Sequence, residues 1–519
     1  MSNSDTCSID DVVTCFQLTG HGVSPDLVRW TQLPVALWNG ESAYDIHALF
    51  TGSATLVRAS SSSSSSSSTA SPSLVPVLVF PGVCDMYPPS GTVPGCKYGY
   101  AFGAAAPANA SDPFLTSWVK TGQAVVNDTF DDPSTAWATA DGELRWIANC
   151  GDGTVGDCGP DPARTSAPLY ATAATTFNGD ETPFAASHFV GFTNLRAGEC
   201  SSLYPLPPLA NGTLPAARMP THVHKWGCEP YTDCVEIGWW REGKRGEVGA
   251  WTGLNGDGRS GSGYQAMDRG FAYAAKDVEG APDGLRVSIA WARLNPSQQG
   301  QQLNNDVQTV ARQVTYHPTL QQLLFYPVPA LDSLRGPLLG SARGQTVTPG
   351  KPVSLGPWTE GNQSDVLVRV RVPSTPTTLY VSVTAEVRVE FYINFPGTAA
   401  AAAAAAAAGQ GGDEAPWAEA EVGLLTADPY VSFKDTLRLL PTDKVLELRL
   451  LVDHAIVEAY WQGGRVAMTV PAPLTESTRI ALTTDTAGAS LAVDVDVWYV
   501  ESAWIGKDEA LSRASRQSI

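Results

Sequence analysis

Apolar and polar residues alternate with a period of two along much of this chain, most clearly over residues 365–372, 378–395 and 445–461. Other β-rich runs, separated by Gly, Pro, Asn or Asp, cover residues 48–57, 74–80, 235–240 and 285–292. Because successive side chains of a strand point to opposite faces, this pattern predicts strands buried on one side. Helical periodicity is scarce. The chain is therefore predicted to be all-β, as a sandwich, a barrel or a propeller.

A stretch rich in Pro and Gly over residues 336–357 marks the expected boundary between two domains. The strands predicted before it are short and rich in Trp, whereas those after it are long and alternate cleanly. The sequence thus predicts a first domain over 20–337 and a two-sheet β-sandwich over 350–505. Residues 1–19 stay unassigned, and residues 506–519 are expected to form a tail.

Two low-complexity tracts interrupt the strand pattern. One is the serine run Ser60–Ser68, inside an insertion over 58–74, and the other is the alanine run Ala399–Ala408, inside an insertion over 398–413. The cost of closing a loop grows only logarithmically with its length, so such insertions are tolerated. A ten-residue alanine helix is marginal in water. Both tracts are therefore predicted to be disordered surface loops without a function.

Length and charge exclude several classes of protein. A chain of 519 residues is expected to form two or three domains. The net charge of −19 argues against a nucleic-acid partner, which would need clustered Lys and Arg. No apolar stretch reaches the length of a membrane span, so no membrane partner is expected. The first residues, MSNSDTCSIDDVVTCFQL, are not recognisable as a signal peptide.

The nine cysteines suggest local disulfides rather than a metal site. The two pairs Cys84/Cys96 and Cys150/Cys158 each close a short loop rich in Gly and Pro. An odd number of cysteines leaves at least one without a partner in the chain, and no C-x-x-C pair is present. His222 and His224 with Cys228 could suggest a metal, but alternate residues on one strand face are the simpler interpretation. No metal and no cofactor is therefore expected.

Four N-glycosylation sequons begin at Asn109, Asn127, Asn211 and Asn362. They are compatible with a glycoprotein but favour secretion only weakly, because four in a chain this long are close to chance. The compartment is left open, as secreted or vacuolar if a signal peptide precedes the printed residues.

The segment FDDPSTAW, residues 130–137, places two acids side by side before a proline. Adjacent carboxylates repel each other, so Asp131 and Asp132 would usually lie in a solvated turn. The same arrangement can also deliver one carboxylate into a site. Pro133 biases Asp132 towards an extended backbone, which suits a side chain at the end of a strand.

Several motifs occur in the order found in the family 32 glycoside hydrolases, the invertases and fructan hydrolases. They are GHGVSPDLVRWTQLPVAL (20–37), YDIHALFTGSATLV (44–57), SDPFLTSWVK (111–120), FDDPSTAW (130–137), GECSSLYPL (198–206), MDRGFAYAAKDV (267–278) and LRLLVDHAIVEAYWQGGRVAMTV (448–470). The resemblance extends from about residue 20 to residue 500 and is closest to the plant members of the family. Its strength lies in the order of the motifs, since none of them is decisive alone.

This resemblance implies a five-bladed β-propeller with an incomplete first blade, followed by a β-sandwich. It implies a retaining hydrolase of β-fructofuranosides such as sucrose or fructans, acting on a small-molecule or oligosaccharide substrate without a cofactor. A retaining glycosidase uses an acid/base and a nucleophile whose carboxyl groups lie about 5 Å apart. The family uses an Asp nucleophile, a Glu acid/base and a second Asp that binds the sugar hydroxyls.

The resemblance assigns the acid/base role to Glu199 in Gly-Glu-Cys, a role that needs the raised pKa that burial and a nearby carboxylate can supply. A solvated Glu in a loop is the structural alternative. Asp132 corresponds to the Asp of the family's Arg-Asp-Pro triplet and would stabilise the transition state. Asp131 replaces the triplet's Arg, so an acceptor stands where a bidentate donor is expected.

Other positions also depart from the family's pattern. Phe50 stands where plant relatives usually have Trp, and it would offer an apolar wall with a smaller stacking area. Trp38 would border the sugar site, although packing in the core or at the rim explains it equally well. The family's Asp-x-x-Lys falls near residues 228–231, where neither residue is kept.

The nucleophile motif, Trp-x-Asn-Asp-Pro-Asn, is not found. Only 19 residues precede Gly20, and their acids, Asp5, Asp10 and Asp11, stand in a different context. The strand carrying the nucleophile is therefore expected to be missing from this chain. Three interpretations stay open: a hydrolase whose printed sequence lacks its beginning, an inactive fructoside-binding pseudoenzyme, and a truncated chain that folds only marginally because a sheet edge is exposed.

Overall fold

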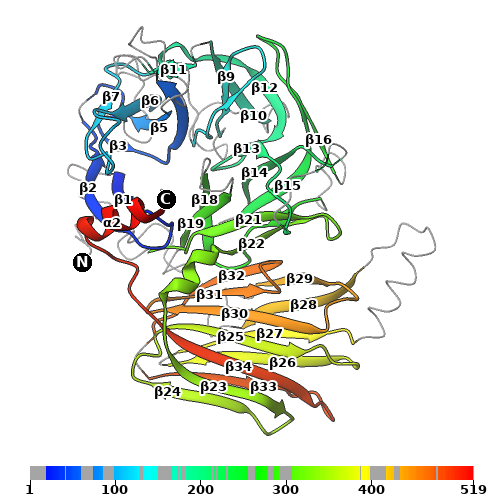
Figure 1. The fold of residues 1–519 in the computed structure, drawn as a ribbon. Helices are drawn as coiled ribbons and strands as arrows, with labels where there is room; N and C mark the ends of the chain where they lie inside the picture. Colours follow the sequence, from blue (N-terminus) through cyan, green and yellow to red (C-terminus); the bar gives the residue numbers. More distant parts are fainter. Residues whose placement is uncertain are drawn as a thin grey trace.

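The computed structural model is built almost entirely of β-strands (Figure 1). It describes residues 19–517, apart from internal gaps at 41, 60–73, 86–98, 128–131, 150–165, 174, 178–181, 212–215, 217–218, 230–231, 255–262, 279–284, 293–306, 386, 398–416, 426–432 and 475–476. The predicted all-β class is therefore confirmed for the described part of the chain. The Ser60–Ser68 run and the Ala399–Ala408 run, predicted as loops, lie outside the described residues.

Residues 19–327 form five sheets within the described part of the chain, numbered here in chain order. Sheet 1 pairs β1 (Thr19–Val23) with β2 (Thr31–Leu37). Sheet 2 contains β3 (Ala48–Leu49), β4 (Ser53–Ala59), β5 (Leu74–Val83), β6 (Tyr100–Pro107), β7 (Trp118–Lys120) and β11 (Thr176–Phe177). Sheet 3 contains β8 (Trp137–Ala138), β9 (Leu144–Ile147), β10 (Ser166–Thr172) and β12 (His188–Arg196), with the short 3-10 helix η2 (Pro183–Ala186) before β12.

The next two sheets follow the same serial order. Sheet 4 contains β13 (Ser202–Pro205), β14 (His222–Glu229), β15 (Thr232–Arg241), β16 (Ala250–Gly253) and β17 (Gln265–Ala266). Sheet 5 contains β18 (Ala272–Val278), β19 (Arg286–Ala292), β20 (Val307–Gln308), β21 (Arg312–His317) and β22 (Gln322–Pro327). The 3-10 helix η4 (Pro329–Leu334) then leads out of sheet 5.

Consecutive sheets pack on one another through separate apolar clusters. One cluster joins Leu37 of sheet 1 to Phe80 of sheet 2, and another joins Phe102 of sheet 2 to Trp146 of sheet 3. Similar clusters join sheet 3 to sheet 4 and sheet 4 to sheet 5. A further cluster brings Val287 of sheet 5 against the segment between β1 and β2. The packing therefore runs from each sheet to the next and returns to the first, as the ribbon in Figure 1 also indicates.

Residues 335–500 form two six-stranded sheets that enclose one large apolar core. The first has the order β23 (Arg335–Val347), β34 (Leu491–Val500), β25 (Gln363–Arg371), β30 (Val445–Asp453), β31 (Ile456–Trp461) and β32 (Val466–Pro471). The second has the order β24 (Val353–Trp358), β33 (Thr478–Thr483), β26 (Thr377–Thr384), β27 (Arg388–Phe395), β28 (Ala418–Leu425) and β29 (Lys434–Leu439). Alternate residues of these strands fill the core, as the period-two pattern predicts.

The stretch expected to separate two domains is itself part of the sandwich. The predicted domain limits leave residues 338–349 between the domains, but β23 covers 335–347 and pairs with β34. The reason is that β23 and β24 are the edge strands of their sheets, where Pro and Gly interrupt no ladder on the outer side. Helix α2 (Lys507–Gln517) lies within the segment predicted as a tail, residues 506–519.

The two parts of the chain are joined by a buried polar contact. The Asp268 carboxylate accepts hydrogen bonds from the Thr469 backbone N–H at 2.9 Å and from Arg312 Nη1 at 2.8 Å. Arg312 Nη2 also donates to Glu458 Oε2 at 2.7 Å, and the Phe271 N–H donates to the Thr469 carbonyl at 2.7 Å. The Phe271 ring belongs to the sandwich core. The segment leading into β18 is therefore fixed to the sandwich.

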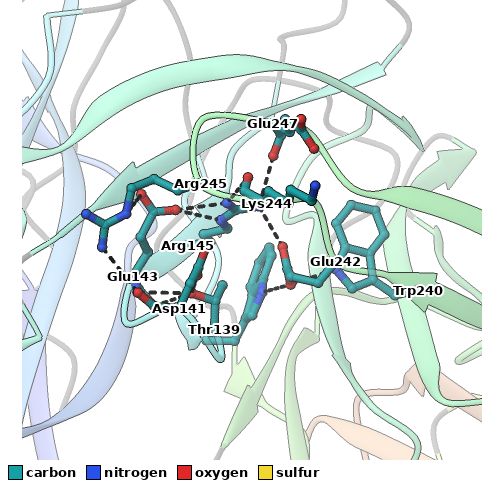
Figure 2. Close-up of polar contacts among 10 residues, drawn as sticks. Thr139, Asp141, Glu143, Arg145, Trp240, Glu242, Lys244, Arg245 and Glu247 are labelled. Carbon is teal, nitrogen blue, oxygen red and sulfur yellow. Dashed lines mark hydrogen bonds and ion pairs between the residues drawn. The ribbon is translucent and has the colours of Figure 1, made fainter.

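A second buried cluster joins sheets 3 and 4 (Figure 2). Arg145 of β9 has no exposed side-chain surface and pairs with Glu143 at 2.8 Å and with Glu242 at 2.7 Å. Its guanidinium also donates to the carbonyls of Lys244 at 2.8 Å and of Glu247 at 3.0 Å. Glu242 accepts in turn from two indole N–H groups. The connection between β15 and β16 is thereby held against the connection between β8 and β9.

No helix of the described residues has both the length and the apolar character needed to cross a bilayer.

Candidate active site

The candidate site forms where the segments that precede the first strands of sheets 3 and 4 meet the start of β4 and strand β18 of sheet 5. The segment after Asp132 runs beside β4, since the Ala136 N–H donates to Thr55 Oγ1 at 2.9 Å and Thr135 Oγ1 donates to the Ala54 carbonyl at 3.0 Å. Lys276 of β18 reaches Ser53 Oγ at 3.3 Å. Motifs far apart in the sequence, TGSAT, DDPSTAW and AYAAK, therefore lie together.

Asp132 and the turn that carries Glu199 are in direct contact. Asp132 Oδ2 accepts a hydrogen bond from the backbone N–H of Cys200 at 2.9 Å. Asp132 and Cys200 both have a positive φ, 47° and 53°, a region that residues other than Gly rarely adopt, so the extended backbone expected for Asp132 before Pro133 is not found. Such a backbone persists only where its surroundings hold it. Asp132 is buried and binds the turn through Oδ2, whereas Glu199 is exposed.

Glu199 projects from a turn packed tightly against sheet 4. Its carbonyl accepts from the Gly227 N–H at 2.8 Å, and its carboxylate accepts a hydrogen bond from the Tyr273 hydroxyl of β18. A Cβ atom added at Gly198 would lie 2.3 Å from the Gly227 carbonyl oxygen, so only glycine permits this approach. The burial that the sequence predicts for an acid/base is not found, because Glu199 is exposed. A phenolic donor holds its carboxylate instead.

A buried lysine lies behind the turn. Lys225 of β14 has no exposed side-chain surface, and its Nζ donates to the Cys200 carbonyl at 2.7 Å. The same Nζ lies 3.7 Å from Asp233 Oδ1. Asp233 Oδ2 accepts from the backbone N–H of Ala275 on β18. The lysine therefore connects the turn to sheets 4 and 5.

Burial and neighbouring charges shift the pKa values of the ionisable groups in this cluster, in some cases in opposite directions. Burial alone would lower the pKa of the Lys225 ammonium, but the surrounding carboxylates, Asp233 foremost, raise it above its ordinary value. Burial raises the pKa of the Asp233 carboxyl against the opposing effect of Lys225. Burial, and then the negative charge of Asp132, raise the pKa of the Cys200 thiol. Lys225 is thus held as a cation, and Cys200 as a neutral thiol.

The pKa of the Tyr273 hydroxyl is raised by burial and by its hydrogen bond to the Glu199 carboxylate. The phenol is therefore held as a donor in the pH range where proteins are folded. A neutral donor that contacts a carboxylate can orient it without contributing a second charge.

The structure brings together two of the five predicted site residues. Asp132 and Glu199 converge through Cys200. Phe50 and Trp38 are exposed aromatic residues at the ends of β3 and β2, and the ring of Phe50 lies 5.6 Å from that of Tyr100. Among the hydrogen bonds and ring contacts of the described residues, none joins Phe50 or Trp38 to the two carboxylates. Asp131 lies outside the described residues.

The cysteines differ in part from the expectation. Cys228 forms a disulfide with Cys234, a pairing across the β14–β15 hairpin that the sequence spacing did not suggest. Cys84 is disulfide-bonded, whereas its expected partner Cys96 lies outside the described residues. The other expected pair, Cys150/Cys158, lies outside them as well.

The disulfide also bears on the weak suggestion of a metal. Cys228 is used in the disulfide, and His224 is buried with its ring stacked on Trp226 at 4.9 Å. The part of the chain that the structure describes holds no group of three or more His, Cys, Asp or Glu arranged for a metal.

Four residues of the cluster, Asp233 among them, were not identified from the sequence. Tyr273 and Lys276 both belong to the MDRGFAYAAKDV motif, whose internal positions had been given no role. Lys225 follows His224 in a strand that reads as ordinary alternation. The one signal for Lys225 was that its alternate neighbours along the strand are apolar, which places the lysine on a buried face. Because a charge is rarely buried without a partner, such a lysine indicates a nearby carboxylate or carbonyl.

Comparison with known proteins agrees with this architecture. The family described as glycosyl hydrolases family 32 N-terminal domain matches residues 18–327, and the family 32 C-terminal domain matches residues 341–499. An acid beta-fructofuranosidase of Solanum lycopersicum is 26% identical over 93% of this chain and 75% of its own length. A fructan 6-exohydrolase of Triticum aestivum is 26% identical over 68% of this chain and 56% of its own length.

Solved structures share the fold at low sequence identity. The crystal structure of fructan 1-exohydrolase IIa from Cichorium intybus matches with a TM-score of 0.71 and 19% identity, over 97% of this chain and 92% of that one. An exo-inulinase from Aspergillus awamori matches with a TM-score of 0.64 and 18% identity, over 93% and 90% of the two chains. Together, the matches to both family domains show that this chain belongs to glycosyl hydrolase family 32.

Proposed function

We propose that this chain is a β-fructofuranoside hydrolase of the retaining type, acting on sucrose or fructans, with Glu199 as the acid/base and Asp132 as the stabiliser of the transition state. The contact between Asp132 and the Cys200 N–H carries the proposal. It fixes two carboxylate-bearing segments, 68 residues apart in sequence, against one another. Their convergence is what an oxocarbenium-like transition state requires, since both groups must act on one sugar ring.

The relatives and neighbours support the substrate class. Those at hand include beta-fructofuranosidases, a fructan 6-exohydrolase, and a Glu-to-Gln variant of the Cichorium intybus enzyme in complex with 1-kestose. Phe50, Trp38 and Asp131 are proposed to contact the sugar. We further infer that sheets 1 to 5 are five blades around one axis, with sheet 1 as a two-stranded first blade.

The nucleophile separates the proposal from its alternative. The family's Asn-Asp-Pro motif does not occur in the printed sequence, and Asp131 stands where the family has Arg. We therefore propose that hydrolysis by the chain as printed is impaired. The alternative function is a fructoside-binding pseudoenzyme, which the missing motif favours, because loss of a covalent nucleophile normally removes several orders of magnitude in rate.

Calorimetric titration with sucrose and with 1-kestose, beside an assay of released fructose, distinguishes the two functions. Binding with measurable turnover supports the hydrolase, and β-fructose as the first product anomer in an NMR time course supports retention. Binding without turnover selects the pseudoenzyme. The absence of both binding and turnover would contradict both functions.

The variant Glu199→Gln should lower turnover by a factor on the order of 10² to 10⁴ and leave the affinity for 1-kestose within about threefold. Glu242→Gln is the matched control, because Glu242 lies in the Arg145 cluster (Figure 2) and not at the candidate site. Equal losses in the two variants would show that Glu199 has no chemical role.

A further inference from the structure

The geometry points to Lys225 as the positioning residue of the turn that carries Glu199. Lys225 binds the Cys200 carbonyl while Asp132 binds the Cys200 N–H, and together these two contacts fix the direction in which Glu199 projects. This inference rests on the proposed function of Glu199. It adds a residue that does not touch the sugar and to which the proposed mechanism gives no part.

Both polar groups of the Cys200 residue are held by side chains rather than by a strand ladder. Asp132 Oδ2 accepts from its N–H at 2.9 Å, and Lys225 Nζ donates to its carbonyl at 2.7 Å. The positive φ of Cys200, 53°, means that the turn has no intrinsic preference for this shape. If either partner is removed, the turn can relax towards ordinary backbone angles and carry the Glu199 side chain with it.

The Lys225 ammonium is buried, and its contacts compensate for that burial. Lys225 has no exposed side-chain surface, and a buried ammonium is tolerated only when charge and hydrogen bonds compensate it. Asp233 at 3.7 Å supplies the charge, and the Cys200 carbonyl supplies the hydrogen bond. Asp233 is itself anchored to β18, the strand that carries Tyr273. The lysine thus connects both supports of Glu199, its turn and its phenolic partner.

Lys225 lies on β14, the strand that pairs with the residues following the turn. Its neighbour in register on β13 is Ser202, two residues after Cys200, and the Gly227 N–H two residues further along β14 donates to the Glu199 carbonyl. Backbone pairing therefore places β14 against the turn, and the Lys225 side chain binds the Cys200 carbonyl, which this pairing leaves without a backbone donor.

The test compares Lys225→Met, which keeps most of the length of the side chain and removes the donor, with Lys225→Arg, which keeps a cation and donors. Arg145→Met is the control for loss of a buried cation away from the site. The first readout is hydrogen–deuterium exchange of the peptide that contains residues 198–204. We expect exchange at least tenfold faster in Lys225→Met, partial recovery in Lys225→Arg, and wild-type exchange in Arg145→Met. Wild-type exchange in Lys225→Met would overturn the inference.

The second readout separates positioning from simple loss of structure. Protonation of the leaving group matters for sucrose but little for an aryl fructoside with a good leaving group. Lys225→Met should therefore lose at least tenfold more in kcat on sucrose than on p-nitrophenyl β-fructofuranoside, with KM within about threefold of wild type. Equal losses on both substrates would overturn the positioning role. An inactive wild type would instead contradict hydrolysis itself, while the exchange experiment would still report on the turn.

Discussion

Two fully buried cations, Arg145 and Lys225, lie in neighbouring sheets and are satisfied in different ways. Arg145 is surrounded by two carboxylates and two carbonyls, none of which belongs to the candidate site (Figure 2). Lys225 has one carbonyl and one carboxylate at 3.7 Å, and that carbonyl belongs to the turn carrying Glu199. The first cluster is closed on itself, whereas the second ends in an exposed carboxylate.

The difference separates stability from function in this fold. The Arg145 cluster joins the β8–β9 and β15–β16 connections, at the opposite end of sheets 3 and 4 from Asp132 and Glu199. Its removal should cost stability and leave the site intact. The Lys225 cluster lies beneath the site, where positive φ values and a carboxylate held by a phenol show the constraints expected of a functional region.

The largest expected effect is on the closed cluster. Arg145→Met leaves Glu242 without its ion-pair partner and leaves Glu143 with only the exposed Arg245, and removing one partner of a buried pair costs about 3–5 kcal/mol. Guanidinium unfolding followed by Trp fluorescence measures the loss. Arg369→Met is the matched control, since the exposed pair of Arg369 with Glu447 at 3.3 Å should cost below about 1 kcal/mol. Comparable losses in the two variants would contradict the importance of burial.

The sandwich illustrates what the sequence predicts well. Alternation over residues 365–372 corresponds to β25, because its inward valines face one continuous core and charged residues take most positions of the other face. β23 was missed because its glycines and its proline resemble linker residues, and only its place at the sheet edge makes them acceptable. Alternation reports burial on one side, not the position of a strand in its sheet.

The sequence predicted only those residues of the candidate site that stand in a recognisable family motif. Asp132 and Glu199 stand in recognisable triplets, whereas Lys225 acts through a backbone carbonyl, and no spacing rule relates it to Cys200 across 25 residues. The pairing of Cys228 with Cys234 likewise depends on a hairpin that brings the two sulfur atoms together. Contacts made by backbone atoms or by strand register leave no pattern in a single sequence.

An intermediate effect should come from His224, beside Lys225 on β14. Burial, followed by the positive charges of Arg196 and Lys225, lowers the pKa of this imidazole to about 3. Because the folded pKa lies below the unfolded value of 6.5, the unfolded state binds the additional proton, and stability falls as the pH drops below 6.5 towards 3. At pH 5 this one group costs about 2 kcal/mol relative to neutral pH.

The measurement is the unfolding midpoint in denaturant at pH 7.5 and at pH 5 for wild type, His224→Phe and His188→Gln. Phe keeps an aromatic ring for stacking on Trp226 and removes the titration, so the variant should lose less stability between the two pH values than wild type. His188→Gln, which removes an exposed histidine, is the control. If His224→Phe lost as much stability between pH 7.5 and pH 5 as wild type, the acid sensitivity would arise from other groups than His224.

The smallest effect returns to the edge of the closed cluster. Arg245 lies 3.4 Å from Glu143 and donates to the Asp141 carbonyl at 3.2 Å, but its side chain is 60% exposed (Figure 2). Solvent screens such a pair, so Arg245→Ala should cost below about 1 kcal/mol, and the loss should shrink further in 1 M salt. A double-mutant cycle with Arg145→Met decides whether the two arginines act together on Glu143. A coupling above about 1 kcal/mol would mean that the cluster extends to the surface and is less closed than its hydrogen bonds indicate.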